Sequence, residues 1–368
     1  MDETKGMKDL TKGSPFKLIL FFALPVFLGC VFQQLYNMAD TIIVGNTVGP
    51  EAFTGVGLTG SIVFLVVGSM NGLTSGFSVK VAQAFGAGEE DRVRRAVGMS
   101  YLLSILVAAV VTAVAVPLTG VLLDLMQTPP AYYEYAYSYL FVIFCGIPAT
   151  VFYNIVAGML RAVGDSRTPL YFLILSALLN VGLDFLFILA FRMHYTGAAV
   201  ATVLSQLISG IGCLICALHR YPVLRPRRSD FRWDFRLAGG HLAQGLPMAL
   251  QFSITAIGCM VQQTALNGLD AALPGVVTAY TAASKVDGIA TQTFVALGTA
   301  MATYTGQNYG AKEYGRIRKG VKVGMLYCLI SCALAFVFDV ALCEPLMRLF
   351  LNADLSANVA EHYTEVIA

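Results

Sequence analysis

The sequence contains few charged residues: Asp, Glu, Lys and Arg make up only 12% of its 368 residues, against about 25% in an average soluble protein. Its net charge is only +2, so it lacks the strongly basic face that would neutralise nucleic-acid phosphates. Eight cysteines do not make a secreted disulfide scaffold in so large and apolar a chain. Hydrophobic residues, in contrast, reach 57%, and the mean hydropathy is +0.70. The composition therefore excludes a soluble domain and indicates a polytopic membrane protein.

Long apolar stretches recur along the whole chain, and about 20 apolar residues suffice for a helix to cross a bilayer. The pattern predicts an all-α protein with nine membrane-spanning helices, at residues 16–42, 52–79, 96–124, 134–160, 168–191, 196–218, 237–266, 274–303 and 321–343. Residues 358–368 are typical of the start of a tenth span. The first span follows a charged stretch and precedes no small-residue cleavage site, so we expect it to be retained.

Basic residues gather on one side of the predicted spans. With the N-terminus in the cytoplasm, the N-terminal tail and the loops after the second, fourth, sixth and eighth spans hold 21 of the 24 Lys and Arg residues. The opposite loops hold only Arg192 and Arg348, and Lys285 lies within a span. This bias predicts a multi-pass protein of the plasma (inner) membrane with a cytoplasmic N-terminus.

Two of the predicted cytoplasmic loops resemble each other. Residues 82–97 read AQAFGAGEEDRVRRAV and residues 306–321 read GQNYGAKEYGRIRKGV, with seven identities at a constant offset of 224. Six spans make one unit, so the halves are expected to be parallel repeats. The repeat predicts a six-helix lobe over 1–218, a basic cytoplasmic linker over 219–236 and an incomplete second lobe over 237–368, truncated after the start of the tenth of twelve helices.

Ionisable residues inside a membrane are costly and therefore informative. Asp40 lies on the first predicted helix, where Gln33, Asn37 and Asp40 share one polar face at i, i+4 and i+7. Pro25 interrupts the same helix and should bend it. Because Asp40 lies near the outer end of its span, it could instead be a structural hydrogen-bond partner at a helix end.

A second intramembrane carboxylate lies on the fifth predicted helix. Asn180 precedes Asp184 by four residues, and the sixth helix offers Thr202. Two carboxylates, an amide oxygen and a hydroxyl are hard oxygen donors that suit Na⁺. They equally suit a proton, because two neighbouring carboxylates in a low dielectric cannot both ionise cheaply. Asp40, Asn180, Asp184 and Thr202 therefore form the candidate cation-coupling site, for Na⁺ or H⁺, and no other cofactor is expected.

The second half offers polar positions but few carboxylates. Span seven carries a polar stripe, and span eight carries Asp287, which is either a functional carboxylate or the partner of another helix. On the fourth span, Tyr139 and Asn154 could line a cavity, although such an aromatic ring more often serves packing. The candidate substrate-cavity residues are Gln33, Asn37, Tyr139, Asn154, Gln251, Thr255, Gln262 and Asp287.

Several of these features together resemble the multidrug and toxic compound extrusion (MATE) transporters. They are Pro25 and Asp40 followed by VGNTVG at 44–49, the GQNYGA loop and its partner, and Asn180-x-x-x-Asp184 with Thr202. The resemblance covers essentially the whole chain. It implies twelve helices in two six-helix lobes and export of cationic or amphipathic compounds in exchange for Na⁺ or H⁺.

The resemblance also implies roles for individual residues. The four candidate coupling residues match the cation site of the family's N-terminal lobe, and Gln33 matches a cavity-lining position there. One branch of the family places a Glu on helix seven, whereas this sequence has Gln251, Ser253 and Thr255 in that neighbourhood. The difference points to coupling centred on the first lobe.

Three functions remain open from the residues. An ion-coupled exporter would act as a monomer in the lipid bilayer, with small organic cations or amphipaths as substrates and no nucleic acid, and a cation would gain from an acidic, aromatic cavity. A lipid-linked precursor flippase would need a large hydrated cationic cavity, whereas the intramembrane charges here are mostly acidic. An intramembrane aspartyl protease would need Tyr-Asp and Gly-x-Gly-Asp, where this chain has Ala39-Asp40 and Val181-Gly182-Leu183-Asp184.

Overall fold

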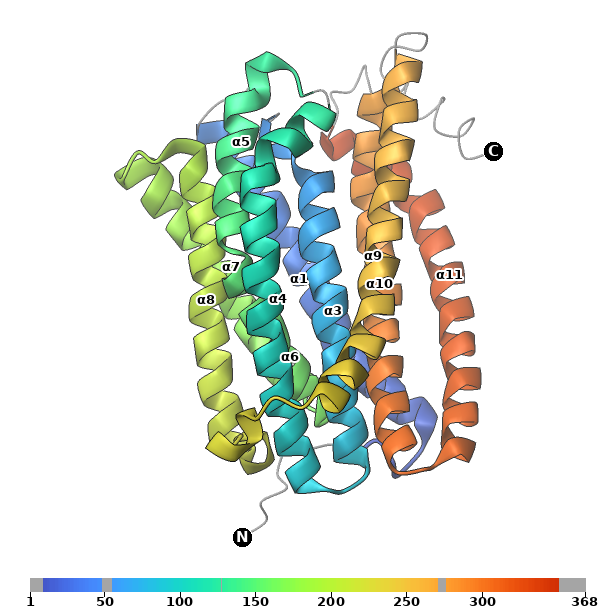
Figure 1. The fold of residues 1–368 in the computed structure, drawn as a ribbon. Coiled ribbons are helices and arrows are strands. Elements are labelled where there is room, and N and C mark those ends of the chain that lie inside the picture. Colours follow the sequence, from blue (N-terminus) through green and yellow to red (C-terminus); the bar gives the residue numbers. More distant parts are fainter. Residues whose placement is uncertain (1–8, 48–54, 127, 271–275, 351–368) are drawn as a thin grey trace.

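The computed structural model describes residues 9–47, 55–126, 128–270 and 276–350, which form a bundle of long helices without strands (Figure 1). The helices are α1 (Pro15–Thr47), α3 (Gly60–Gly86), α4 (Glu90–Leu125), α5 (Pro130–Cys145), α6 (Ile147–Ala162), α7 (Arg167–Phe185), α8 (His194–Arg220), α9 (Phe235–Asp270), α10 (Val276–Gly310) and α11 (Tyr314–Phe350). Within the described residues, seven helices are long and apolar enough to cross a membrane, and α5 with α6 forms an eighth, bent span. The predicted all-α, polytopic fold is confirmed.

The predicted spans coincide with helices, but several helices are longer than predicted and one predicted span is broken. Helix α3 continues to Gly86, beyond the predicted end at residue 79, so the connection to α4 is only three residues long. The span predicted over 134–160 is two helices that meet at Gly146 with a 48° bend. Pro148 lies in the first turn of α6, where its missing N–H costs nothing and its ring starts a new helix. The predicted tenth span lies outside the described residues.

The two similar loops adopt the same turn. Helices α3 and α10 end 224 residues apart, at Gly86 and Gly310, and α4 and α11 each begin four residues later. In the middle of each turn the backbone is left-handed, with φ of +74° at Gly88 and +59° at Lys312. Glycine adopts this conformation freely, whereas lysine must be held in it. The backbone geometry is therefore repeated even where the side chain is not.

The two halves meet along α1, α3, α9 and α10. Helix α1 packs against α10, and α3 packs against both α9 and α10. Where the repeated loops meet, a Cβ at Gly86 would overlap the main-chain carbonyl of Gln307, and a Cβ at Gly310 would overlap that of Gln83. The offset of 224 converts one pair into the other, because Gly86 corresponds to Gly310 and Gln83 corresponds to Gln307. The helix ends therefore touch backbone to backbone around a local two-fold relationship.

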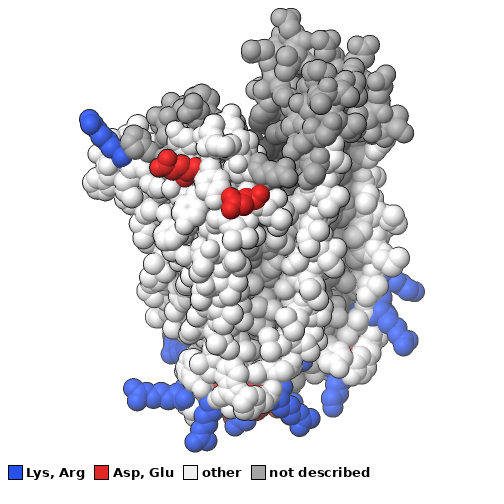
Figure 2. Space-filling model, turned by 45° about the horizontal axis from the view of Figure 1, so that its top comes forward, with Lys and Arg blue, Asp and Glu red and all other residues white. Residues whose placement is uncertain are grey.

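Lysine and arginine gather at one end of the bundle, the end at which α1 begins (Figures 1 and 2). This end, which carries the α3–α4 and α10–α11 turns and the 219–236 segment, is called the basic end below. The N-terminal segment is fastened here: the Leu10 N–H donates to Gln307 Oε1 at 2.9 Å, and the side chains of Asn308 and Arg316 donate to the Leu10 carbonyl at 3.2 Å. Gln307 Nε2 in turn donates to the Ala162 carbonyl of α6 at 2.8 Å. These bonds tie the first residues, the first lobe and the second half together.

Candidate functional site

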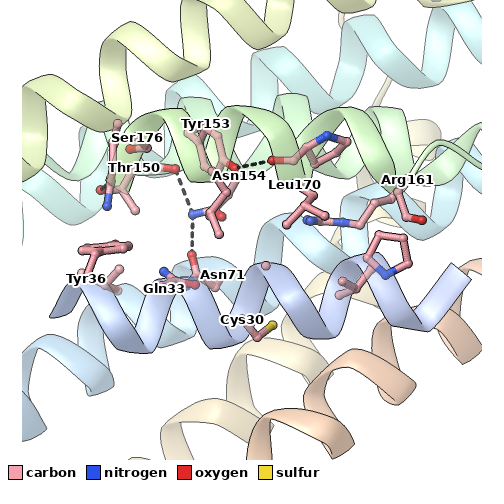
Figure 3. Close-up of a pocket in the computed structure, with 18 residues that line it drawn as sticks. Cys30, Gln33, Tyr36, Asn71, Thr150, Tyr153, Asn154, Arg161, Leu170 and Ser176 are labelled. Carbon is pink, nitrogen blue, oxygen red and sulfur yellow. Dashed lines mark hydrogen bonds between the residues drawn. The ribbon is translucent and has the colours of Figure 1, made fainter. Parts of the chain in front are cut away.

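A cavity of about 120 Å³ lies within the first lobe, between α1, α3, α6, α7 and α8 (Figure 3). Its wall combines apolar side chains with amides and hydroxyls, which is the usual make-up of a small-molecule site. The polar and aromatic residues that line it are Gln33, Tyr36, Asn71, Thr150, Tyr153, Asn154, Arg161, Ser166, Ser176 and Gln206. The cavity thus lies among helices that come together only in the folded lobe.

Hydrogen bonds fix the polar wall of this cavity. Asn154 Nδ2 donates to Asn71 Oδ1 at 2.6 Å and to the Thr150 carbonyl at 2.9 Å, so α6 is joined to α3. The Thr150 hydroxyl donates to Gln206 Oε1 at 2.6 Å and joins α6 to α8. Amides held by such bonds are oriented before any ligand arrives.

The structure brings three of the four candidate coupling residues together. Asn180 and Asp184 on α7 are 1% and 0% exposed, and Asn180 Nδ2 donates to Thr202 Oγ1 of α8 at 3.2 Å. Among the described residues, the buried Asn180 Oδ1 has no hydrogen-bond donor. An amide oxygen, a hydroxyl and a carboxylate on neighbouring turns of α7 and α8 are hard donors that fit Na⁺, and the carboxylate also fits a proton.

This cluster continues the wall of the cavity. Ser176 and Gln206 line the cavity, and Asn180 and Thr202 lie four residues away from them on the same two helices, further from the basic end. Asp184 lies one further turn along α7. The main chain of Asp40 is one turn beyond cavity-lining Tyr36 on α1, while its side chain lies outside the described ones. The candidate ion and ligand sites are therefore adjacent.

Of the remaining predicted site residues, three line the cavity and the others lie elsewhere or outside the described residues. Pro25, Gln33 and Asn154 line the cavity, and α1 continues through Pro25 as one helix. Asn37 is exposed, and the Tyr139 ring packs into an apolar cluster with Val56, Ile188 and Ala198. Gln251, Thr255 and Gln262 lie exposed on α9 and do not line this cavity, and the Asp287 side chain lies outside the described ones.

Sequence reasoning missed Arg161, which it assigned to a cytoplasmic loop. Arg161 lies in the last turn of α6, and its side chain extends into the cavity towards α1 (Figure 3). None of the described residues that line the cavity is Asp or Glu. The expected acidic cavity rested on Asp40 and Asp287, whose side chains lie outside the described ones, so it stays a prediction. A charge at the end of an apolar stretch looks like a loop charge in the sequence, because hydropathy carries no information on side-chain direction.

Comparison with known proteins agrees with this architecture. The MatE family model matches residues 25–186 and 247–368. The chain is 29% identical over 362 residues to the probable multidrug resistance protein YpnP of Bacillus subtilis, covering 98% of this chain and 80% of the relative. It is 28% identical to the probable multidrug resistance protein NorM of Thermotoga maritima, covering 91% and 72%. The outward-facing structure of a multidrug resistance MATE family transporter superimposes with a TM-score of 0.86 at 24% identity, covering 96% and 79%. The chain belongs to the MatE family, and it is a multi-pass membrane transporter rather than an enzyme.

Proposed function

We propose that this protein exports amphipathic organic compounds, organic cations among them, from the cytoplasm in exchange for Na⁺ or H⁺. The observation that carries the proposal is the cluster of buried Asp184 and Asn180 with half-buried Thr202, which lies one to two turns beyond the polar cavity on the same helices, α7 and α8. The multidrug resistance names of relatives such as YpnP and NorM support the substrate class. In the proposed orientation, the basic end faces the cytoplasm of the cell at its plasma membrane.

Ion binding and ligand binding are coupled because both sites use α7 and α8. Neutralisation of Asp184, by H⁺ or by Na⁺, removes a buried charge and changes how α7 and α8 pack. Na⁺ would be held by the Asp184 carboxylate, Asn180 Oδ1 and the Thr202 hydroxyl, and it would supply positive charge there. Because the cavity uses Ser176 and Gln206 of the same helices, ligand and ion bias one conformational equilibrium and must affect each other's affinity reciprocally.

The proposal is tested with the purified chain in proteoliposomes. Movement of a fluorescent organic cation is followed under an imposed Na⁺ gradient and then under an imposed pH gradient. We expect transport under one of them, and that gradient names the coupling ion. Folded protein that transports the dye under neither gradient would contradict coupled export and favour the lipid-linked precursor flippase.

Replacement of Thr202 tests the ion site separately from the cavity. Thr202→Val keeps the shape but removes the hydroxyl, so the Asn180 amide loses its acceptor and a cation loses a ligand. We expect the half-saturating concentration of the coupling ion to rise by about tenfold, which corresponds to about 1.4 kcal/mol. Thr202→Ser keeps the hydroxyl and is the matched control. Identical ion dependence in the Val and Ser variants would remove Thr202 from the site.

A further inference from the structure

Arg161 is the one charged residue among the described residues that line the cavity. It is partly buried, it belongs to α6, and its guanidinium lies in the space between α6 and α1 (Figure 3). Neutral groups surround that space, including Gln33, Asn71 and Ser166. Among the described residues that line it, the cavity therefore carries a single formal charge, and it is positive.

No side chain among the described residues balances this charge: Arg161 takes part in none of their ion pairs, and its guanidinium donates no hydrogen bond to them. The nearest acid in the sequence, Asp165, is occupied elsewhere. Its carboxylate accepts from the Thr168 N–H at 3.0 Å and from the Tyr221 hydroxyl at 2.6 Å, and it lies 4.0 Å from the guanidinium of Arg220.

The coupling carboxylates are too far away to balance it. Cys30 and Leu170 line the cavity together with Arg161. Asp40 lies ten residues beyond Cys30 on α1, about 15 Å along the helix at 1.5 Å per residue. Asp184 lies fourteen residues beyond Leu170 on α7, about 21 Å by the same measure. A guanidinium without a counter-ion is costly inside a membrane protein, so a partner is to be expected.

We propose that the partner is the ligand, and that Arg161 makes this cavity a binding site for an anionic oxygen group, a carboxylate or a phosphate. The planar guanidinium binds such groups with two parallel hydrogen bonds. The volume of about 120 Å³ is below the roughly 300–1,000 Å³ that encloses a drug-sized molecule, so the site suits a head group rather than a whole amphipath. Resting on the proposed export function, this assigns zwitterionic and anionic amphipaths to the substrate class.

The test uses two forms of one xanthene dye, the zwitterionic free acid and its cationic ethyl ester, which differ only in the carboxylate. Binding is measured by fluorescence with the 368-residue chain in nanodiscs of phosphatidylcholine. We expect the wild type to bind the acid at least tenfold more tightly than the ester. Arg161→Gln should reduce this preference to about twofold or less, and Arg161→Lys should retain part of it.

Arg318→Gln is the matched control, because it removes one exposed positive charge from α11, away from the cavity. Equal affinity of the wild type for acid and ester would overturn the proposal, and this comparison holds even if Arg161→Gln fails to fold. Transport distinguishes the two proposals. If the ester is exported under a gradient but the wild type shows no preference for the acid, the export function is supported and the proposed anion site is contradicted. If the preference for the acid depends on Arg161 but no transport occurs, the anion site is supported and the export function is contradicted.

The source of the anionic group is decided by competition. Inorganic phosphate that displaces the acid from the wild type, but has no effect on Arg161→Gln, would identify a free anion as a sufficient ligand. Displacement by phosphatidylglycerol added to the nanodiscs, with no effect of phosphate, would identify a lipid head group. If neither displaces the bound acid, the preference for the acid does not arise from its charge and the proposal fails.

Discussion

Asp184→Asn is expected to abolish gradient-driven export while leaving the protein folded in the membrane. Asp184 is 0% exposed at the end of α7, one turn beyond Asn180, whose amide bonds to Thr202. The asparagine side chain has nearly the same volume, but it cannot take up a proton and has no negative charge with which to bind Na⁺. The initial export rate should fall by at least about 100-fold, the upper range of coupling between two sites.

Two further measurements make this result specific. Equilibrium binding of the dye should survive in Asp184→Asn, because the cavity wall begins eight residues away, at Ser176. Asp124→Asn makes the same chemical change at an exposed position on α4 and should export normally. An Asp184→Asn variant that exports as the wild type does, under either gradient, would show that Asp184 has no role in coupling.

Gly310→Ala is expected to force the two halves apart at the basic end. A Cβ there would overlap the Gln83 carbonyl, and main-chain atoms at the end of a helix cannot rotate away. Overpacking of this kind costs roughly 1–3 kcal/mol. That cost shifts by about 5- to 150-fold the equilibrium between the arrangement in which these helix ends touch and one in which they are separated. We expect faster hydrogen exchange at the ends of α3 and α10 and a several-fold loss of export.

The repeat provides an internal check on this prediction. Gly86→Ala would place its Cβ against the Gln307 carbonyl and should have the same effect. Gly315→Ala is the control, because the space around Gly315 is open and alanine is a better helix former. If hydrogen exchange and export are unchanged in both Gly86→Ala and Gly310→Ala, the two halves do not need this close contact.

The sequence was most informative where one physical property determines the outcome. The order and approximate positions of the helices follow from the apolar runs. The repeat at offset 224 recurs in the helix ends at Gly86 and Gly310, although these lie seven residues beyond the predicted ends at 79 and 303. Asn180 and Asp184 were placed on one face because four residues make about one turn, and both are buried in the structure. These features depend on neighbours along the chain.

Features that depend on neighbours across the bundle were not accessible from the sequence. The bend at Gly146 leaves the hydropathy of 134–160 unchanged, so that stretch resembles one straight span. Arg161 was taken for a loop charge, although its side chain lies in the cavity. Tyr139 could have faced the cavity or the apolar cluster in which it packs, because the choice depends on Ile188 and Ala198, which belong to distant segments.

The fastening of Leu10 has a consequence for the order of assembly during synthesis. Leu10 leaves the ribosome 297 residues before Gln307, the side chain that accepts its N–H. At about 5–20 residues per second, this interval is about 15–60 s. Throughout that time the spans of the first lobe stay in the membrane without the hydrogen bond between Leu10 and Gln307. Leu10 therefore belongs to the part of the chain that is made first, yet its hydrogen bond to Gln307 forms only after most of the second half has been made.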